Sequence, residues 1–117
     1  MTDIDAIDSV VAQYSKFGWT LERILLSNVD VDVRARFSSK YPEARVLKRP
    51  LDALWFSRPR STSVTWEIRR ITGSPFALLT VFDSEASEEE RENILRDLEE
   101  QIAKTAADIG GEIPLEK

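Results

Sequence analysis

Two carboxylates and an arginine fall where neighbouring strands are expected, and together they form the arrangement in this chain that could support catalysis. Asp52 lies in one predicted strand, and Glu67 and Arg69 lie in the next. The chain contains no histidine and no cysteine, which removes the usual zinc and copper ligands and the commonest general base near neutral pH. Catalysis would depend on carboxylates, Lys, Arg, Tyr, Ser or Thr, with a hard cation such as Mg²⁺. These residue types favour a protein that is not an enzyme and that needs no cofactor.

The segment Pro50-Leu51-Asp52, followed by Glu67-Ile68-Arg69, loosely resembles the pattern of the PD-(D/E)xK nucleases. The resemblance implies a Mg²⁺-dependent phosphodiesterase in which Asp52 and Glu67 hold the metal. The sequence departs from that pattern at two points, because an extra residue separates the proline from the aspartate and Arg69 stands where the family has lysine. Arginine stays charged and is a poor proton acceptor. We therefore prefer the competing interpretation, a set of cross-strand ion pairs on the polar face of a sheet.

Arg58 and Arg60 flank Pro59 in the loop expected between the first two strands of a meander, ahead of Ser61-Thr62-Ser63. Two guanidinium groups and several hydroxyls on a loop could bind a phosphate or a carboxylate of a partner. A solvated turn whose arginines keep a sheet edge soluble is the simpler interpretation, and we favour it. The candidate binding residues are Arg58, Arg60, Asp52, Glu67 and Arg69.

Charge is segregated along the chain, whose net charge is −5. The segment 34–70 holds ten basic and three acidic residues, whereas 83–117 holds twelve acidic and four basic ones. The basic segment could bind an anion or a nucleic acid. Alternatively, basic strands and loops lie against acidic helices of the same chain or of a second copy. We favour the second alternative, because the protein is acidic overall and shows no RNA-binding motif.

Three strands at about 51–57, 63–71 and 76–82 are the clearest structural signal, because β-branched and aromatic runs alternate with turn-forming residues. The middle strand places Val64, Trp66 and Ile68 on one face and Thr65, Glu67 and Arg69 on the other. The third strand is apolar on both faces, so we expect it inside the sheet or under a helix on each side. Trp19, Trp55 and Trp66 are expected in the core rather than in a ligand pocket.

Helices are predicted at about 3–17 and 87–109 from apolar residues at steps of three and four. Ser87 and Glu90 form a capping box at the start of the second. A short helix capped by Asp30 or Asp32 is expected to run through Tyr41. Segment 19–26 fits a strand better than a helix, with Trp19, Leu21 and Leu25 on one face, and 45–47 is either a short strand or a lead into the meander. We expect the first and last helices to cover one face of the sheet.

Together these patterns predict a single α+β domain over residues 1–117, with a mainly antiparallel sheet. The sequence shows no membrane-spanning run and no secretory signal, so we expect a cytoplasmic protein without membrane partners. The leading hypothesis is a non-enzymatic protein-interaction or ligand-binding module that forms a homodimer or binds another protein. Nucleic-acid binding through 34–70 is possible but less favoured.

Overall fold

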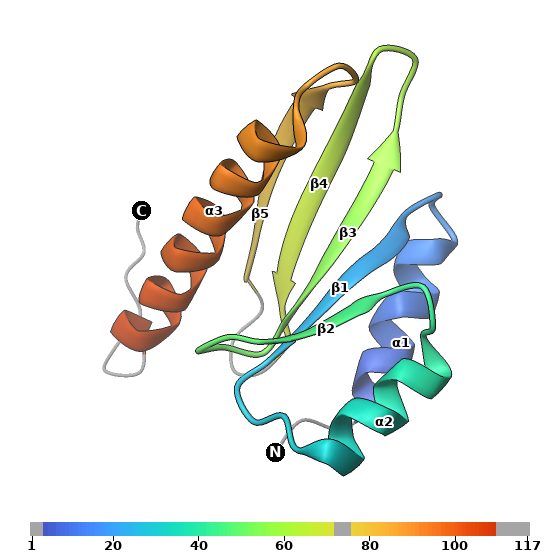
Figure 1. Cartoon of the computed structure of the whole chain (residues 1–117), viewed down its shortest axis with the longest axis vertical. Coiled ribbons are helices and arrows are strands. Elements are labelled where there is room, and N and C mark those ends of the chain that lie inside the picture. The colour runs from blue at the N-terminus through green and yellow to red at the C-terminus, as the bar shows by residue number, and fades with distance from the viewer. Residues whose placement is uncertain (1–3, 72–75, 110–117) are drawn as a thin grey trace.

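The computed structural model describes residues 4–71 and 76–109. Within these ranges the elements are α1 (Ile4–Ser15), β1 (Thr20–Leu26), α2 (Val31–Lys40), β2 (Arg45–Lys48), β3 (Ala53–Pro59), β4 (Ser63–Arg70), β5 (Phe76–Asp83) and α3 (Glu88–Ile109). The strands form one sheet in the order β2-β1-β3-β4-β5 (Figure 1). The predicted α+β fold, with an N-terminal helix and a long C-terminal helix, is confirmed. None of the described helices is long and apolar enough to cross a membrane.

The predicted meander is formed by β3, β4 and β5, which pair antiparallel in sequence order. β3 extends through Arg58 and Pro59, so the loop between β3 and β4 is shorter than expected. Segment 19–26 is a strand, as favoured, and it pairs antiparallel with β3 and parallel with β2. The parallel pair is joined through α2, because parallel neighbours need a crossover rather than a hairpin.

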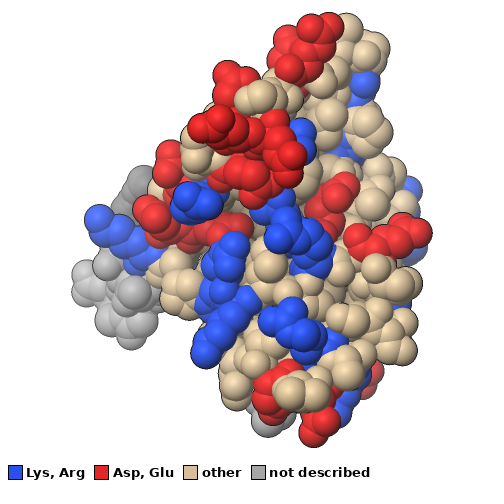
Figure 2. All heavy atoms as spheres, in the orientation of Figure 1, with Lys and Arg blue, Asp and Glu red and all other residues tan. Residues whose placement is uncertain are grey.

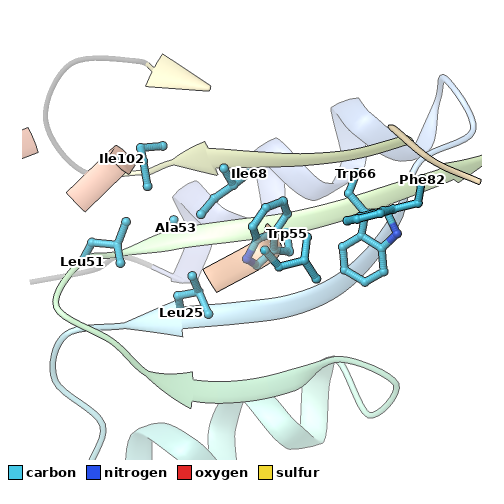
Figure 3. Packing of buried hydrophobic residues seen from close by; sticks show 9 residues of the cluster. Leu25, Leu51, Ala53, Trp55, Trp66, Ile68, Phe82 and Ile102 are labelled. Atoms are coloured by element: carbon cyan, nitrogen blue, oxygen red, sulfur yellow. The ribbon is translucent and has the colours of Figure 1, made fainter. Parts of the chain in front are cut away.

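The helices cover opposite faces of the sheet, which corrects the expectation that the first and last helices share a face. Leu54 and Phe56 of β3 pack in the cluster that includes Ile7 of α1, whereas Trp55 packs in the cluster that includes Leu95 of α3. Figure 3 shows the second cluster, and Figure 1 shows α3 apart from α1 and α2. The physical reason is that β3 is apolar on both faces, so each face needs its own cover.

A bulge in β1 overturns the expected grouping of Trp19, Leu21 and Leu25 on one face. The pairing with β3 shifts register between Leu21 and Arg23. Trp19 and Leu21 therefore pack with α1, and Leu25 packs in the α3 cluster. An extra residue in one strand reverses the alternation of side chains beyond it, and a sequence pattern read with a strict period of two does not reveal this.

β5 lies at the edge of the sheet, although its apolar sequence predicted an internal strand or a helix on each face. Phe82 is buried in the cluster under α3. On the opposite face Leu79 and Val81 are 60% and 63% exposed. This face stays open because α1 packs on β1 and β3, two strands further into the sheet.

The predicted helix caps are present where the sequence placed them. Ser87 and Glu90 exchange hydrogen bonds of 3.0 and 3.1 Å between backbone N–H and side-chain oxygen, as in a capping box. Asp30 caps α2 by accepting a bond of 2.8 Å from the N–H of Val33. Gly18 follows α1 with φ of +85°, a conformation that glycine adopts without strain. This residue turns the chain directly into β1.

Candidate functional site

Three of the five candidate residues, Arg58, Glu67 and Arg69, line one hollow beside α1, which we call the α1 hollow. It has a volume of about 350 Å³, and the rest of its lining is Gln13, Tyr14, Phe17 and Trp19. The β3–β4 pairing places Glu67 opposite Phe56 and Arg69 opposite Leu54, on the sheet face that carries α1. The polar face of β4 predicted from alternation therefore lies against a helix rather than in open solvent.

The other two candidates lie elsewhere. Asp52 is four residues before Phe56, the partner of Glu67, which separates the two backbones by roughly 13 Å at about 3.3 Å per residue. Its Oδ1 accepts bonds of 2.7 and 3.0 Å from the backbone N–H and hydroxyl of Ser27. Arg60 is exposed in the β3–β4 loop. Asp52 and Glu67 thus do not converge as a paired metal site requires, and within the described ranges no three acidic side chains form a group that could hold a metal ion.

Aromatic rings hold the two arginines of the α1 hollow. The Arg58 guanidinium lies 5.5 Å from the centre of the Trp19 ring and donates a hydrogen bond of 3.2 Å to the carbonyl of Phe17. The Arg69 guanidinium lies 5.8 Å from the centre of the Tyr14 ring. The Tyr14 and Trp19 rings meet edge to face at 5.9 Å. Both cations are consequently positioned before any ligand arrives, which lowers the entropic cost of binding an anion.

Tyr14 links α1 to the polar face of β4. Its hydroxyl donates a short hydrogen bond to Glu67, and its ring stacks on Phe56 with centroids 4.0 Å apart. Burial raises the pKa of Tyr14 to about 12, and the carboxylate of Glu67 acts in the same direction. Tyr14 therefore stays protonated near neutral pH and acts as a hydrogen-bond donor to Glu67 rather than as a proton acceptor.

Next to the α1 hollow lies a strip of β5 whose side chains are exposed and whose backbone lies at the edge of the described sheet. Ala77, Leu79 and Val81 lie on the sheet face that carries the α1 hollow. Ala77 pairs with Arg69 of β4, and Leu79 pairs with Glu67 of β4. These three residues and Asp83 are exposed, and we call the four of them the β5 strip. The strip continues the α1 hollow outward across the sheet.

The backbone of the β5 strip faces the sheet edge. The N–H of Ser84 donates to the carbonyl of Thr62 at 3.0 Å, which continues the β4–β5 register by one pair. N–H and C=O groups of one residue point the same way in an antiparallel ladder, and the direction alternates. Even-numbered residues of β5 thus bond to β4, and those of the β5 strip point toward the edge of the described sheet.

The opposite edge of the sheet is protected. β2 has only four residues, and Arg45 and Lys48 at its two ends are exposed. Short edge strands with charged side chains resist pairing with another chain. β5 has eight residues and carries no charge before Asp83. The two edges therefore differ in the property that decides whether a foreign strand can add.

Basic residues of β1 and of the segment before β3 pair with acidic residues of α3. Arg23 makes a two-pronged contact with Glu92, and Arg49 Nε donates to Glu99 at 2.9 Å. Figure 2 shows Lys and Arg side chains in the middle of one face, next to Asp and Glu side chains that lie over α3. The favoured explanation of the segregated charge, pairing within the chain, thus accounts for part of the basic segment.

Comparisons with protein-family models, with curated proteins and with solved structures find no match to this chain. Tyr14 was not among the predicted site residues, and Trp19, expected in the core rather than in a ligand pocket, is half-buried and lines the α1 hollow, because the positions of both depend on how α1 packs. Residues 76–82 are apolar on both faces, and this pattern predicted burial. Exposure of the β5 strip was therefore missed even though its sequence signal was recognised.

Proposed function

We propose that this protein is a non-enzymatic interaction module that binds a β-strand of another polypeptide along β5. One observation carries the proposal: Leu79 and Val81, the apolar residues 60% and 63% exposed, are also those whose backbone groups point to the sheet edge. Strand addition uses backbone hydrogen bonds for affinity and alternate side chains for specificity. Both elements are present in the same residues of the β5 strip.

Aromatic and arginine side chains beside the strip support the same function. Interface centres are enriched in Tyr, Trp and Arg, and the α1 hollow supplies Tyr14, Trp19, Arg58 and Arg69. Phe17, at the rim of the hollow, is 67% exposed. The absence of histidine and cysteine from the chain and the protonated state of Tyr14 favour binding over catalysis.

Backbone amide exchange measured by NMR tests the proposal, with a synthetic peptide of alternating Thr and Val as the added strand. We expect the Leu79 and Val81 amides to be protected, either by the peptide or by the protein itself at high concentration. Val81→Pro removes an N–H that points to the edge while keeping every β4–β5 bond, so the variant should fold and its Leu79 amide should lose this protection. Val31→Lys changes an apolar residue that is 83% exposed on α2 and should bind as the wild type does. Free exchange of both wild-type amides, with the peptide present and at high protein concentration, would overturn the proposal.

A second candidate function is the binding of a small anion in the α1 hollow. Its specific support is that the guanidinium groups of Arg58 and Arg69 are both held against rings of that hollow. Inorganic phosphate is a suitable probe, with the indole N–H signal of Trp19 as the readout. We expect this signal to shift on titration and the shift to be lost in Arg58→Ala and Arg69→Ala, but retained in Arg96→Ala on exposed α3. A signal unmoved by millimolar phosphate would remove this candidate.

A further inference from the structure

We infer that the strand added to β5 is β5 of a second copy of this chain, with Thr80 on a two-fold axis. This inference rests on the proposed function, because it names the partner of the same edge. In this arrangement the two β5 strands run antiparallel, and Leu79 lies opposite Val81 of the partner subunit. The two sheets then become one continuous sheet.

Backbone directions restrict how two β5 strands can pair. Residues that point to the edge must face residues of the other copy that also point to the edge, and in β5 these are the odd-numbered ones. A two-fold axis must therefore pass through a residue rather than between two. An axis at Thr80 brings Ala77, Leu79, Val81 and Asp83 into the pairing. The Asp83 carbonyl already accepts a hydrogen bond from the N–H of Ala86, so about six hydrogen bonds form between the two strands.

The side chains of the β5 strip are self-complementary in this register. Leu79 meets the partner's Val81, and by symmetry Val81 meets the partner's Leu79, so four exposed apolar side chains cover one another. β5 carries no charged residue between Phe76 and Phe82, so no like charges are opposed within that stretch. Pairing of β5 with β2 of another copy would instead produce an open chain of molecules rather than a closed dimer. Two-fold pairing of β5 closes the assembly.

Charge complementarity selects Thr80 rather than Leu79 as the residue on the axis. With Thr80 on the axis, Ala77 lies opposite the partner's Asp83. Arg69 is the β4 neighbour of Ala77 on the same face, and its Cα lies two strand spacings, about 9.6 Å, from that of the partner's Asp83. An extended arginine and an aspartate span this distance across the methyl group of Ala77, so in the dimer the Arg69 guanidinium leaves the Tyr14 ring and turns toward the partner's Asp83. Two such ion pairs form by symmetry, and they are lost when the axis moves to Leu79.

Single-cysteine variants of the full chain test the register, because the natural sequence has no cysteine. Thr80 would lie opposite Thr80 of the partner subunit in a non-hydrogen-bonded pair. Their Cα atoms would be about 4.5 Å apart, which is within the range of a disulfide. We expect Thr80→Cys to form a covalent dimer under mild oxidation. Leu79→Cys should not form a covalent dimer, because position 79 of the partner subunit lies diagonally across the strand pair at about 7–8 Å. Preferential cross-linking of Leu79→Cys would overturn the register.

The mass of the unmodified protein provides an independent measurement. Light scattering at about 100 µM should give twice the chain mass of 13.3 kDa, and Val81→Pro should give the monomer mass. Arg69→Glu should weaken association at least tenfold, and the double variant Arg69→Glu/Asp83→Arg should restore it. A wild-type monomer whose Leu79 and Val81 amides are protected by the Thr/Val peptide would overturn self-association while supporting strand binding. A monomer with unprotected amides would overturn both proposals.

Discussion

The indole N–H of Trp55 donates a hydrogen bond of 2.8 Å to the carboxylate of Glu99, a residue 44 positions later in the chain. Trp55 is fully buried and Glu99 is 6% exposed, so this bond links β3 to α3 inside the apolar layer. The other oxygen of Glu99 accepts from Arg49, which supplies the opposite charge that a buried carboxylate needs. One acidic side chain thus fixes α3 against the central strand and against the chain segment before it.

Replacing Glu99 should therefore destabilise the fold. Glu99→Ala leaves the Trp55 N–H buried without an acceptor and Arg49 without its partner, and we expect a loss of about 2–4 kcal/mol in the free energy of unfolding. Glu99→Gln keeps an acceptor and should lose less. The control is Glu100→Ala, an exposed neighbour expected to change the free energy by under about 0.5 kcal/mol. Urea denaturation measures all three, and equal effects at both positions would contradict the role of Glu99.

Tyr14 makes the stability of the fold depend on alkaline pH. Burial and Glu67 raise the pKa of Tyr14 from its ordinary value of 10.0 to about 12 in the folded protein. Because the folded state holds the proton more tightly, the stabilisation is fully present below pH 10 and is lost as the pH rises from 10 to 12. Tyr41→Phe leaves Tyr14 as the single tyrosine. Absorbance of the phenolate in this variant should titrate well above pH 10, and a midpoint at pH 10 would disagree with a buried donor.

Glu92 gives stability the opposite dependence on pH. The hydrogen bond from Arg23 lowers the pKa of Glu92 below its ordinary value of 4.5, and burial only partly opposes this. The stabilisation is therefore present above pH 4.5 and disappears as the pH falls through the folded-state pKa. We expect Glu92→Gln to be less stable at pH 7 and to lose less stability on acidification than the wild type. Glu88→Gln, at an exposed position of the same helix, should follow the wild-type curve.

Trp66 belongs to the core, as the alternation of β4 predicted, and is 8% exposed. It meets Trp55 and Phe82 edge to face, and the guanidinium of Arg23 lies 5.5 Å from its ring centre. We expect Trp66→Ala to cost roughly 3–5 kcal/mol. Trp19→Ala removes a ring that is only half-buried and should cost less. An unchanged denaturation midpoint for Trp66→Ala would be incompatible with this packing.

Local features of the fold could be predicted because each depends on residues close in sequence. The β4 alternation from Val64 to Arg69, the Ser87–Glu90 capping box and the Asp30 cap are of this kind. Their physical cause is a short-range periodicity or a hydrogen bond within one turn. The structure has the alternation and the capping box where the sequence placed them, and of the two predicted caps, Asp30 and Asp32, it shows Asp30.

Features that depend on the order of the strands could not be predicted in the same way. Residues 76–82 look alike whether they form a central strand or an edge strand with an open face, and only the sheet order shows that Leu79 is exposed. Tyr14 reaches Glu67 only because α1 packs on β3, a contact between residues 53 positions apart. The candidate site was therefore predicted in part: Arg58, Glu67 and Arg69 of the α1 hollow were named, whereas Tyr14 and the exposed face of β5 were not.

The bulge at Glu22 means that β1 changes phase within its own length. Residues before it supply apolar side chains to the layer of α1, and the odd-numbered residues after it supply the layer of α3. Deleting this one residue would make Leu21 and Arg23 direct neighbours opposite Phe56 and Trp55, so a regular strand would keep Trp19 and Leu21 in the layer of α1. Glu22 is thus the one extra residue of β1, and the alternation of side chains holds on each side of it but not across it.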